Sequence, residues 1–213
     1  MKILGISCSL RKESNSEMLV KEALTTAAEA GADTDLVTLQ GKNIKPCDGC
    51  FACSAKGICH IKDDMQDIYP KVINADGIIF STPVFFWSVA GQTKCLIDRL
   101  YALYQDGRLL NKVGGVITIA SSMGHAGAIN LFYTFFAASH IFAADFVYGY
   151  GRDRGEISKD RHAMQSAREL GKQMVLMTGK GFKYPEPYNI AVYRYVQKNL
   201  GIDSCPPRGR FQS

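Results

Sequence analysis

Long apolar runs are absent from this sequence of 213 residues. No stretch approaches the roughly 18 uninterrupted apolar residues that a membrane-spanning helix requires, so no membrane partner is expected. The apolar run at the N-terminus, within residues 1–7, is too short for a secretory signal peptide. We therefore expect a cytoplasmic protein in a reducing compartment, where clustered cysteines are metal ligands more often than disulfides.

Runs of adjacent basic residues and internal repeats are also missing. The net charge is +5, and residues 180–213 contribute six basic side chains against two acidic ones. These charges are dispersed among prolines and tyrosines, which argues against a nucleic-acid interface. We expect one domain over residues 1–179, followed by a basic and aromatic arm over residues 180–213.

Signatures of several enzyme classes are missing as well. No Ser/His/Asp or paired-carboxylate arrangement is evident, so hydrolytic chemistry has no support. The dinucleotide pattern G-x-G-x-x-G and the Walker pattern ending in GK[ST] do not occur. What remains is an ordinary soluble composition, with 46% hydrophobic and 21% charged residues.

Short apolar segments alternate with stretches of helical periodicity. The expected strands are residues 2–7, 34–39, 77–82, 113–120 and 141–148, and the expected helices are about 14–31, 63–75, 91–104, 130–139 and 158–178. Because each strand is nearly all apolar, helices should cover both faces of a parallel sheet. The prediction is an α/β fold with a doubly wound, five-stranded parallel sheet.

Three loops follow the first, third and fourth strands, where such a sheet binds its ligand. Residues 7–16 combine four hydroxyls, an amide, Arg11 and a helix N-terminus, a set that suits a phosphate monoester. Residues 82–88 hold three consecutive aromatics, which should cover a flat ligand or a neighbouring subunit. Small residues at 120–127 let backbone approach a ligand edge. A plain capped helix and a buried hydrophobic turn are the alternatives for the first two loops.

Four of the seven cysteines lie within thirteen residues, after the second strand, at Cys47, Cys50, Cys53 and Cys59. Thiolates separated by two residues suit the corners of an iron–sulfur cubane, and Gly57 lets the chain return Cys59 to the same centre. Zinc sites usually pair two C-x2-C units across a longer gap. The spacing favours an iron–sulfur cluster, with a zinc knuckle, a disulfide pair or free thiols as alternatives.

Over about residues 1 to 150 the sequence resembles the flavodoxin-like NADPH-dependent FMN reductases, and in particular the iron–sulfur flavoproteins. The resemblance is carried by Ser9-x-Arg11 with Ser14-Asn15-Ser16, the cysteine run, Asp63-Asp64-Met65, residues 75–79, Thr82-Pro83-Val84-Phe85, and Lys94 with Asp98-Arg99. Only the cysteine run separates the iron–sulfur flavoproteins from plain flavin reductases. The first loop departs from the usual Gly-Ser-Pro-Arg of the family, and the third lacks the usual Gly-Gly pair.

The resemblance implies contacts to two cofactors. The FMN phosphate would be held by Ser9, Arg11, Ser14, Asn15 and Ser16. The ribityl chain and one side of the isoalloxazine would be lined by Pro83, Val84, Phe85, Phe86, Trp87 and Ser88. The pyrimidine edge of the flavin would be approached by Ser121, Ser122, Met123, Gly124 and His125. A [4Fe–4S] cluster would be ligated by Cys47, Cys50, Cys53 and Cys59.

The leading hypothesis is an FMN-dependent oxidoreductase in which the cluster passes single electrons and the flavin converts them to two-electron chemistry. The alternatives are a cluster-free NAD(P)H-dependent FMN or quinone reductase and a non-enzymatic flavin or metal redox sensor. The resemblance implies a homodimer or homotetramer, in which the cysteine loop of one subunit lies near the flavin of another. It also implies NAD(P)H or a ferredoxin as candidate electron donors.

Overall fold

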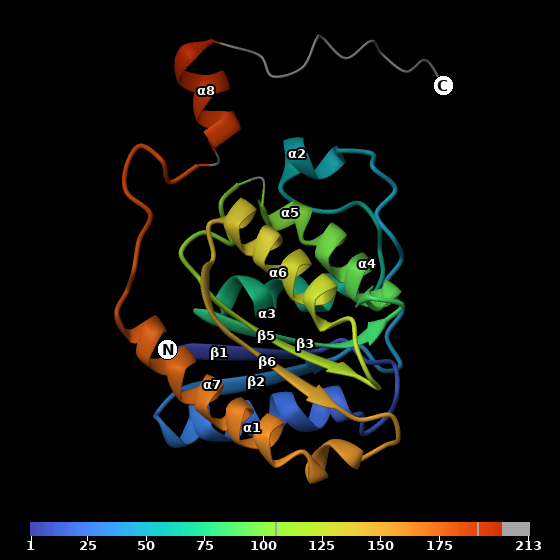
Figure 1. Cartoon of the computed structure of the whole chain (residues 1–213). Coiled ribbons are helices and arrows are strands. Elements are labelled where there is room, and N and C mark those ends of the chain that lie inside the picture. Colours follow the sequence, from blue (N-terminus) through green and yellow to red (C-terminus); the bar gives the residue numbers. More distant parts are fainter. Residues whose placement is uncertain (105, 191, 202–213) are drawn as a thin grey trace.

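Five parallel strands form the central sheet of the computed structural model, which describes residues 1–104, 106–190 and 192–201 (Figure 1). The strands are β1 (Lys2–Ser7), β2 (Asp33–Thr38), β3 (Gly77–Phe85), β5 (Val113–Ala120) and β6 (Phe142–Tyr150), in the order β2-β1-β3-β5-β6. A short strand β4 (Ser88–Val89) pairs antiparallel with the end of β3. This order is that of flavodoxin-like folds, which confirms the predicted doubly wound sheet.

Helices cover both faces of the sheet (Figure 1). On one face lie α1 (Asn15–Glu29) and α7 (Arg161–Gly179), and on the other lie α3 (Met65–Asn74), α4 (Gly91–Arg99) and α6 (His125–Ser139). The shorter elements are α2 (Ala52–Lys56), α5 (Tyr101–Tyr104), the 3₁₀ helix η1 (Glu156–Lys159) and α8 (Val192–Leu200). Each face of the sheet has its own hydrophobic core, and successive strand residues point into opposite cores. Ile3 packs toward α1, whereas Leu4 packs toward α3. None of the helices in the described ranges has the length and apolar character to cross a membrane.

Local sequence explains where helices begin. Ser14 caps α1 by accepting a hydrogen bond from the Glu17 amide at 3.1 Å, as its capping-box pattern predicts. Asp160 caps α7 in the same way, accepting from the Ala163 amide at 2.9 Å. The predicted start of the last long helix at residue 158 was therefore too early. Residues 156–159 form the separate turn η1.

Three other predicted boundaries were wrong. The helix predicted over about 130–139 begins at His125, because Gly124, in the short loop after β5, adopts a left-handed conformation and turns the chain into α6. The helix predicted over 91–104 is divided at Leu100 into α4 and α5. The third strand continues to Phe85, since its end pairs with β4.

The start of the C-terminal arm packs on the edge of the domain. The ring of Tyr184 stacks on His140 with centroids 4.2 Å apart and lies 5.0 Å from the ring of Phe142. The Tyr184 amide donates to Asn111 Oδ1 at 2.9 Å. The parts of the predicted arm at residues 191 and 202–213 lie outside the described residues, and the division of the chain at residue 179 stays a prediction.

Candidate functional site

A cavity of about 350 Å³ opens at the carboxyl ends of the central strands. Its lining consists of Ser9, Arg11, Ser14, Asn15, Ser16, Pro83, Val84, Phe85, Phe86, Ile119, Ser121, Gly151 and Arg152. All five residues predicted from the first loop are thus brought together with four from the second loop and one from the third. Their meeting point is the edge at which open α/β sheets bind ligands.

The first loop surrounds the N-terminus of α1. Ser9, Ser14 and Ser16 are buried, and the Ser9 hydroxyl accepts a hydrogen bond from the Arg11 amide at 3.2 Å. The amides of Asn15 and Ser16 belong to the first helical turn, where no intrahelical carbonyl is available to them. Hydroxyls, free helical amides and a cation in one place form an anion-binding site that fits a phosphate.

The loop after β6 contributes two lining residues that the sequence analysis missed, Gly151 and Arg152. Arg11 Nη1 donates to the Arg152 carbonyl at 3.1 Å, and Asn15 Nδ2 donates to the Asp153 carbonyl at 2.9 Å. A Cβ on Gly151 would lie 2.7 Å from Asn15 Nδ2, so glycine permits this approach. The sequence did contain a signal for these residues. Gly151 and Arg152 directly follow the last strand, whose carboxyl end lies at the ligand-binding edge of the sheet.

The second loop is a two-residue hairpin turn rather than an open loop. Phe85 pairs with Ser88, and the residues between them, Phe86 and Trp87, have φ angles of 43° and 69°. A left-handed backbone is costly for bulky side chains, and such strain is found mainly at functional sites. Phe86 is 96% exposed although it lines the cavity. The turn therefore holds an aromatic ring in water at the mouth of the candidate ligand site.

The remaining predicted flavin contacts lie outside the cavity lining, namely Trp87, Ser88, Ser122, Met123, Gly124 and His125. His125 opens α6, and its Nδ1 lies 2.9 Å from Thr118 Oγ1. Its Nε2 is buried without a hydrogen-bond partner in the described part of the chain, and its ring lies beside those of Tyr148 and Tyr150, with centroids 5.4 and 5.2 Å away. This burial lowers the pKa of His125 below its ordinary value, so the ring is neutral at pH 7.

The cysteine-rich loop lies after β2, as predicted, and folds around the short helix α2. Left-handed backbone at Gly49, Phe51 and Gly57 turns the loop. The four cysteines Cys47, Cys50, Cys53 and Cys59 are free thiols, and burial increases from the first two to the last. Burial, together with the nearby thiols of the other three, raises the pKa of Cys53. Four free thiols on one loop are the donor type that an iron–sulfur cluster requires.

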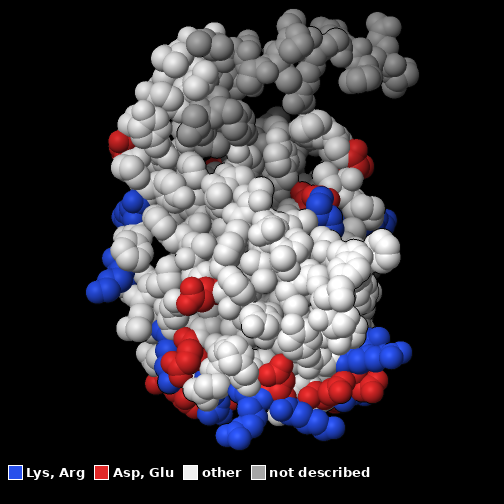
Figure 2. All heavy atoms as spheres, viewed as in Figure 1, with Lys and Arg blue, Asp and Glu red and all other residues white. Residues whose placement is uncertain are grey.

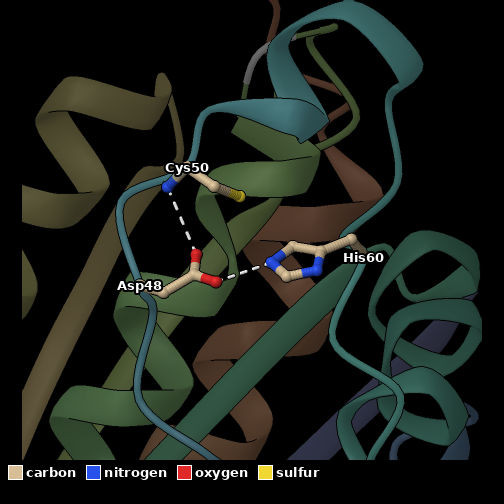
Figure 3. Close-up of side chains that lie close together, drawn as sticks. All are labelled: Asp48, Cys50 and His60. Atoms are coloured by element: carbon tan, nitrogen blue, oxygen red, sulfur yellow. Dashed lines mark hydrogen bonds and ion pairs between the residues drawn. The ribbon is translucent and has the colours of Figure 1, made fainter. Parts of the chain in front are cut away.

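Asp48 ties the first part of this loop to its end (Figure 3). Its carboxylate accepts from the Cys50 amide at 3.2 Å and lies 2.7 Å from His60 Nε2. The hydrogen bonds from Cys50 and His60 lower the pKa of Asp48 to about 2. Ligand atoms of Asp48, Cys50 and His60 lie within 4.8 Å of one another. The trio contains a single thiol and therefore differs from the four-thiol donor set of an iron–sulfur cluster.

Comparison with known proteins identifies the family of this chain. The sequence model of the NADPH-dependent FMN reductase family matches residues 1–145. An iron–sulfur flavoprotein from Methanocaldococcus jannaschii is 38% identical over 184 residues, which cover 82% of this chain and 95% of the relative. An iron–sulfur flavoprotein from Archaeoglobus fulgidus is 30% identical over 178 residues, covering 82% and 79% of the two chains.

Among solved structures, a flavodoxin, WrbA-like protein from Agrobacterium tumefaciens superposes with a TM-score of 0.59 at 15% identity. The match covers 85% of this chain and 98% of the other, and at this identity it shows the fold alone. The sequence comparisons show more than the fold, because the family model spans residues 1–145 and two relatives at 30% identity or more cover 82% of this chain. The chain belongs to the NADPH-dependent FMN reductase family of flavin-dependent oxidoreductases, and its relatives include iron–sulfur flavoproteins.

Proposed function

We propose that the protein is an FMN-dependent oxidoreductase that also carries a [4Fe–4S] cluster on Cys47, Cys50, Cys53 and Cys59. The observation that carries the proposal is the gathering of four free thiols on one loop of a flavin-reductase fold. Relatives named iron–sulfur flavoproteins, similar over most of this chain, support it. The thiols fit iron better than zinc because their spacing lacks two separated C-x2-C units.

The chain's part in FMN binding is to neutralise and orient the phosphate. The hydroxyls of Ser9, Ser14 and Ser16 and the first amides of α1 suit its oxygens, and Arg11 offsets its charge. Residues 83–86 line one side of the site. The contacts of Trp87, Ser88 and residues 122–125 with the flavin rest on the family resemblance.

Flavin and cluster together supply coupled two-electron and one-electron transfer when they are bound. The chain's residues would hold both groups, and the loop between β2 and α3 would position the thiols for the cluster. NAD(P)H and a ferredoxin are the proposed electron donors. The exposed Phe86 ring at the rim of the cavity offers an apolar surface for the donor to approach.

A homodimer or homotetramer is the proposed assembly. Charged side chains are scarce in the middle of the face that Figure 2 shows, over α6 and β6, and gather below it over α1 and α7. Exposed aromatics on the edge strand β6 include Phe146, Tyr148 and Tyr150. An uncharged aromatic face of this kind is typical of a subunit interface.

An anaerobic purification tests the proposal. Iron, acid-labile sulfide and FMN are measured in one preparation, together with the absorption spectrum. We expect about four irons per FMN and a broad cluster absorption that bleaches on reduction. Replacing one ligand, Cys50→Ala, should remove the cluster and leave FMN bound. A clean flavin spectrum without iron after reconstitution would instead identify a cluster-free NAD(P)H-dependent reductase.

A further inference from the structure

We infer that Asp63 and Arg99 are positioning residues for the cluster: their buried ion pair joins the two ends of the cysteine loop and sets its shape before iron binds. The inference rests on the proposed function only for the identity of the group that the loop holds. The arrangement of the loop ends is a property of the chain itself.

Arg99 stands out because it is a fully buried arginine at the end of α4. Its side chain is 0% exposed and that of its partner Asp63 is 1% exposed. Arginine and aspartate are almost never fully buried unless they are paired, and burying such a pair often gives no net gain in stability. The pair therefore needs an explanation other than stability of the core.

The hydrogen bonds of Arg99 supply that explanation. Its Nη1 donates to Asp63 Oδ2 at 2.7 Å and to the Lys45 carbonyl at 3.0 Å. Its Nη2 donates to Asp63 Oδ1 at 3.0 Å and to the Ile61 carbonyl at 3.3 Å. Lys45 precedes the first cysteine and Ile61 follows the last. A single planar guanidinium thus fixes the chain on both sides of the cysteine loop.

Asp63 joins the same two segments from the acceptor side. Its Oδ2 accepts from the Lys45 amide at 2.9 Å, and its Oδ1 accepts from the Met65 amide at 3.1 Å. The neighbouring Asp64 accepts from the Asn43 amide at 2.6 Å. The incoming segment 43–45 is therefore bonded to the outgoing segment 61–65 at several points.

The last cysteine is hydrogen-bonded to the same outgoing segment. Gln66 Nε2 donates to the carbonyls of Cys59 and Ile61, at 3.3 and 2.6 Å. The Tyr69 hydroxyl donates to the Arg99 carbonyl at 3.0 Å. Burial opposes the charge of Arg99, but the hydrogen bond to Asp63 and the nearby Tyr69 and Cys59 leave the pKa of Arg99 above its ordinary value.

Hydrogen exchange of the iron-free wild-type protein with FMN bound tests the inference without a substitution. The Lys45 and Met65 amides donate hydrogen bonds to Asp63. They should exchange at least about 100-fold more slowly than the amides of the exposed residues Asp48 and Gly49. Equal exchange in the iron-free protein, with protection only after iron is added, would overturn the inference. If the wild-type chain never takes up iron, the proposed cluster is refuted. The hydrogen-exchange measurement would still decide whether the ion pair shapes the cysteine loop.

A double substitution provides the second test. Asp63→Leu with Arg99→Met replaces the ion pair by apolar side chains of similar volume, a change that buried pairs often tolerate. We expect FMN to stay bound, iron to fall from about four to below about two per FMN, and thiol alkylation of the iron-free loop to accelerate several-fold. Arg99→Lys, which keeps the charge but loses the planar fork, should retain an intermediate iron content.

The matched control removes the partly exposed pair of Asp35 and Lys71, whose charged atoms lie 2.8 Å apart between β2 and α3. Asp35→Leu with Lys71→Met should leave iron content and alkylation rates unchanged. Wild-type iron content, cluster reduction potential and alkylation rates in the Asp63–Arg99 double variant would overturn the inference. If that variant loses FMN as well as iron, hydrogen exchange of the wild-type protein decides the question.

Discussion

The carbonyl oxygen of Trp87 lies directly against Gly127, where an added Cβ would come within 2.0 Å of it. The first turn of α6 therefore supports the strained hairpin that borders the candidate FMN site. Because the obstructing atom is backbone, no side-chain rotation can relieve the contact. The position of the hairpin depends on the absence of a side chain at residue 127.

Gly127→Ala should displace the hairpin. We expect the free energy of unfolding to fall by about 1–3 kcal/mol, the usual cost of overpacking, and FMN to bind more weakly. Urea denaturation and FMN fluorescence titration measure the two effects. Gly91→Ala is the matched control, since a Cβ there meets open space at the start of α4 and should be neutral or stabilising. Unchanged stability of Gly127→Ala would contradict the close contact.

Phe86→Asn should stabilise the protein. Asparagine tolerates the left-handed backbone of this turn better than phenylalanine, and the exposed Phe86 ring has little packing to lose. We expect a gain of about 1 kcal/mol in the free energy of unfolding, measured by chemical denaturation. Trp87→Asn is the comparison, because Trp87 packs against Gly124 and its loss should offset the gain. A loss of stability in Phe86→Asn would show that the ring is packed in solution.

Arg11→Ala should weaken FMN binding through the phosphate alone. Removing one charge-assisted contact is expected to cost about 1.5–3 kcal/mol, or roughly 10- to 100-fold in affinity. Riboflavin, which lacks the phosphate, should bind the variant and the wild type equally. Substitution of the neighbouring exposed Lys12, which is not part of the cavity lining, is the control. Equal losses for FMN and riboflavin would place Arg11 away from the phosphate.

His125 should make stability depend on pH. Its pKa is lowered by burial in the folded protein, whereas the unfolded chain has the ordinary value of about 6.5. The unfolded chain therefore binds more protons below that pH, and stability falls as the pH drops below about 6.5. Denaturant midpoints between pH 5 and 8, about the range over which histidine titrates, measure the slope. His125→Gln should reduce the slope, and an identical slope in this variant would assign it to other groups.

The features that follow local rules were predictable from the sequence. Apolar strands, the Ser14 cap and the cysteine spacing each give a direct signal, so the sheet, the first loop and the cysteine loop were placed correctly. Arg152 was missed because its position in the cavity depends on how the end of β6 packs beside α1, a contact between residues far apart in sequence.

Two other features run against local preference. Phe86 and Trp87 occupy turn positions that favour asparagine and glycine, so an aromatic pair did not indicate a tight hairpin. Arg99 is charged, which predicts exposure, and only the tertiary arrangement of Asp63 and two carbonyls explains its burial. Sequence patterns report on backbone preference and hydrophobicity, and both features are determined by contacts that override them.

The link between Asp63 and Arg99 spans 36 residues of sequence. During synthesis the four cysteines are added to the chain before Arg99, and the two ends of the loop cannot be joined by this pair until β3 and α4 have followed. If the loop holds the proposed cluster, insertion of iron into a correctly shaped loop would therefore follow folding of about half the domain. A nascent chain that stops before α4 would present the same cysteines as an open segment, exposed to oxidation and to the wrong metal.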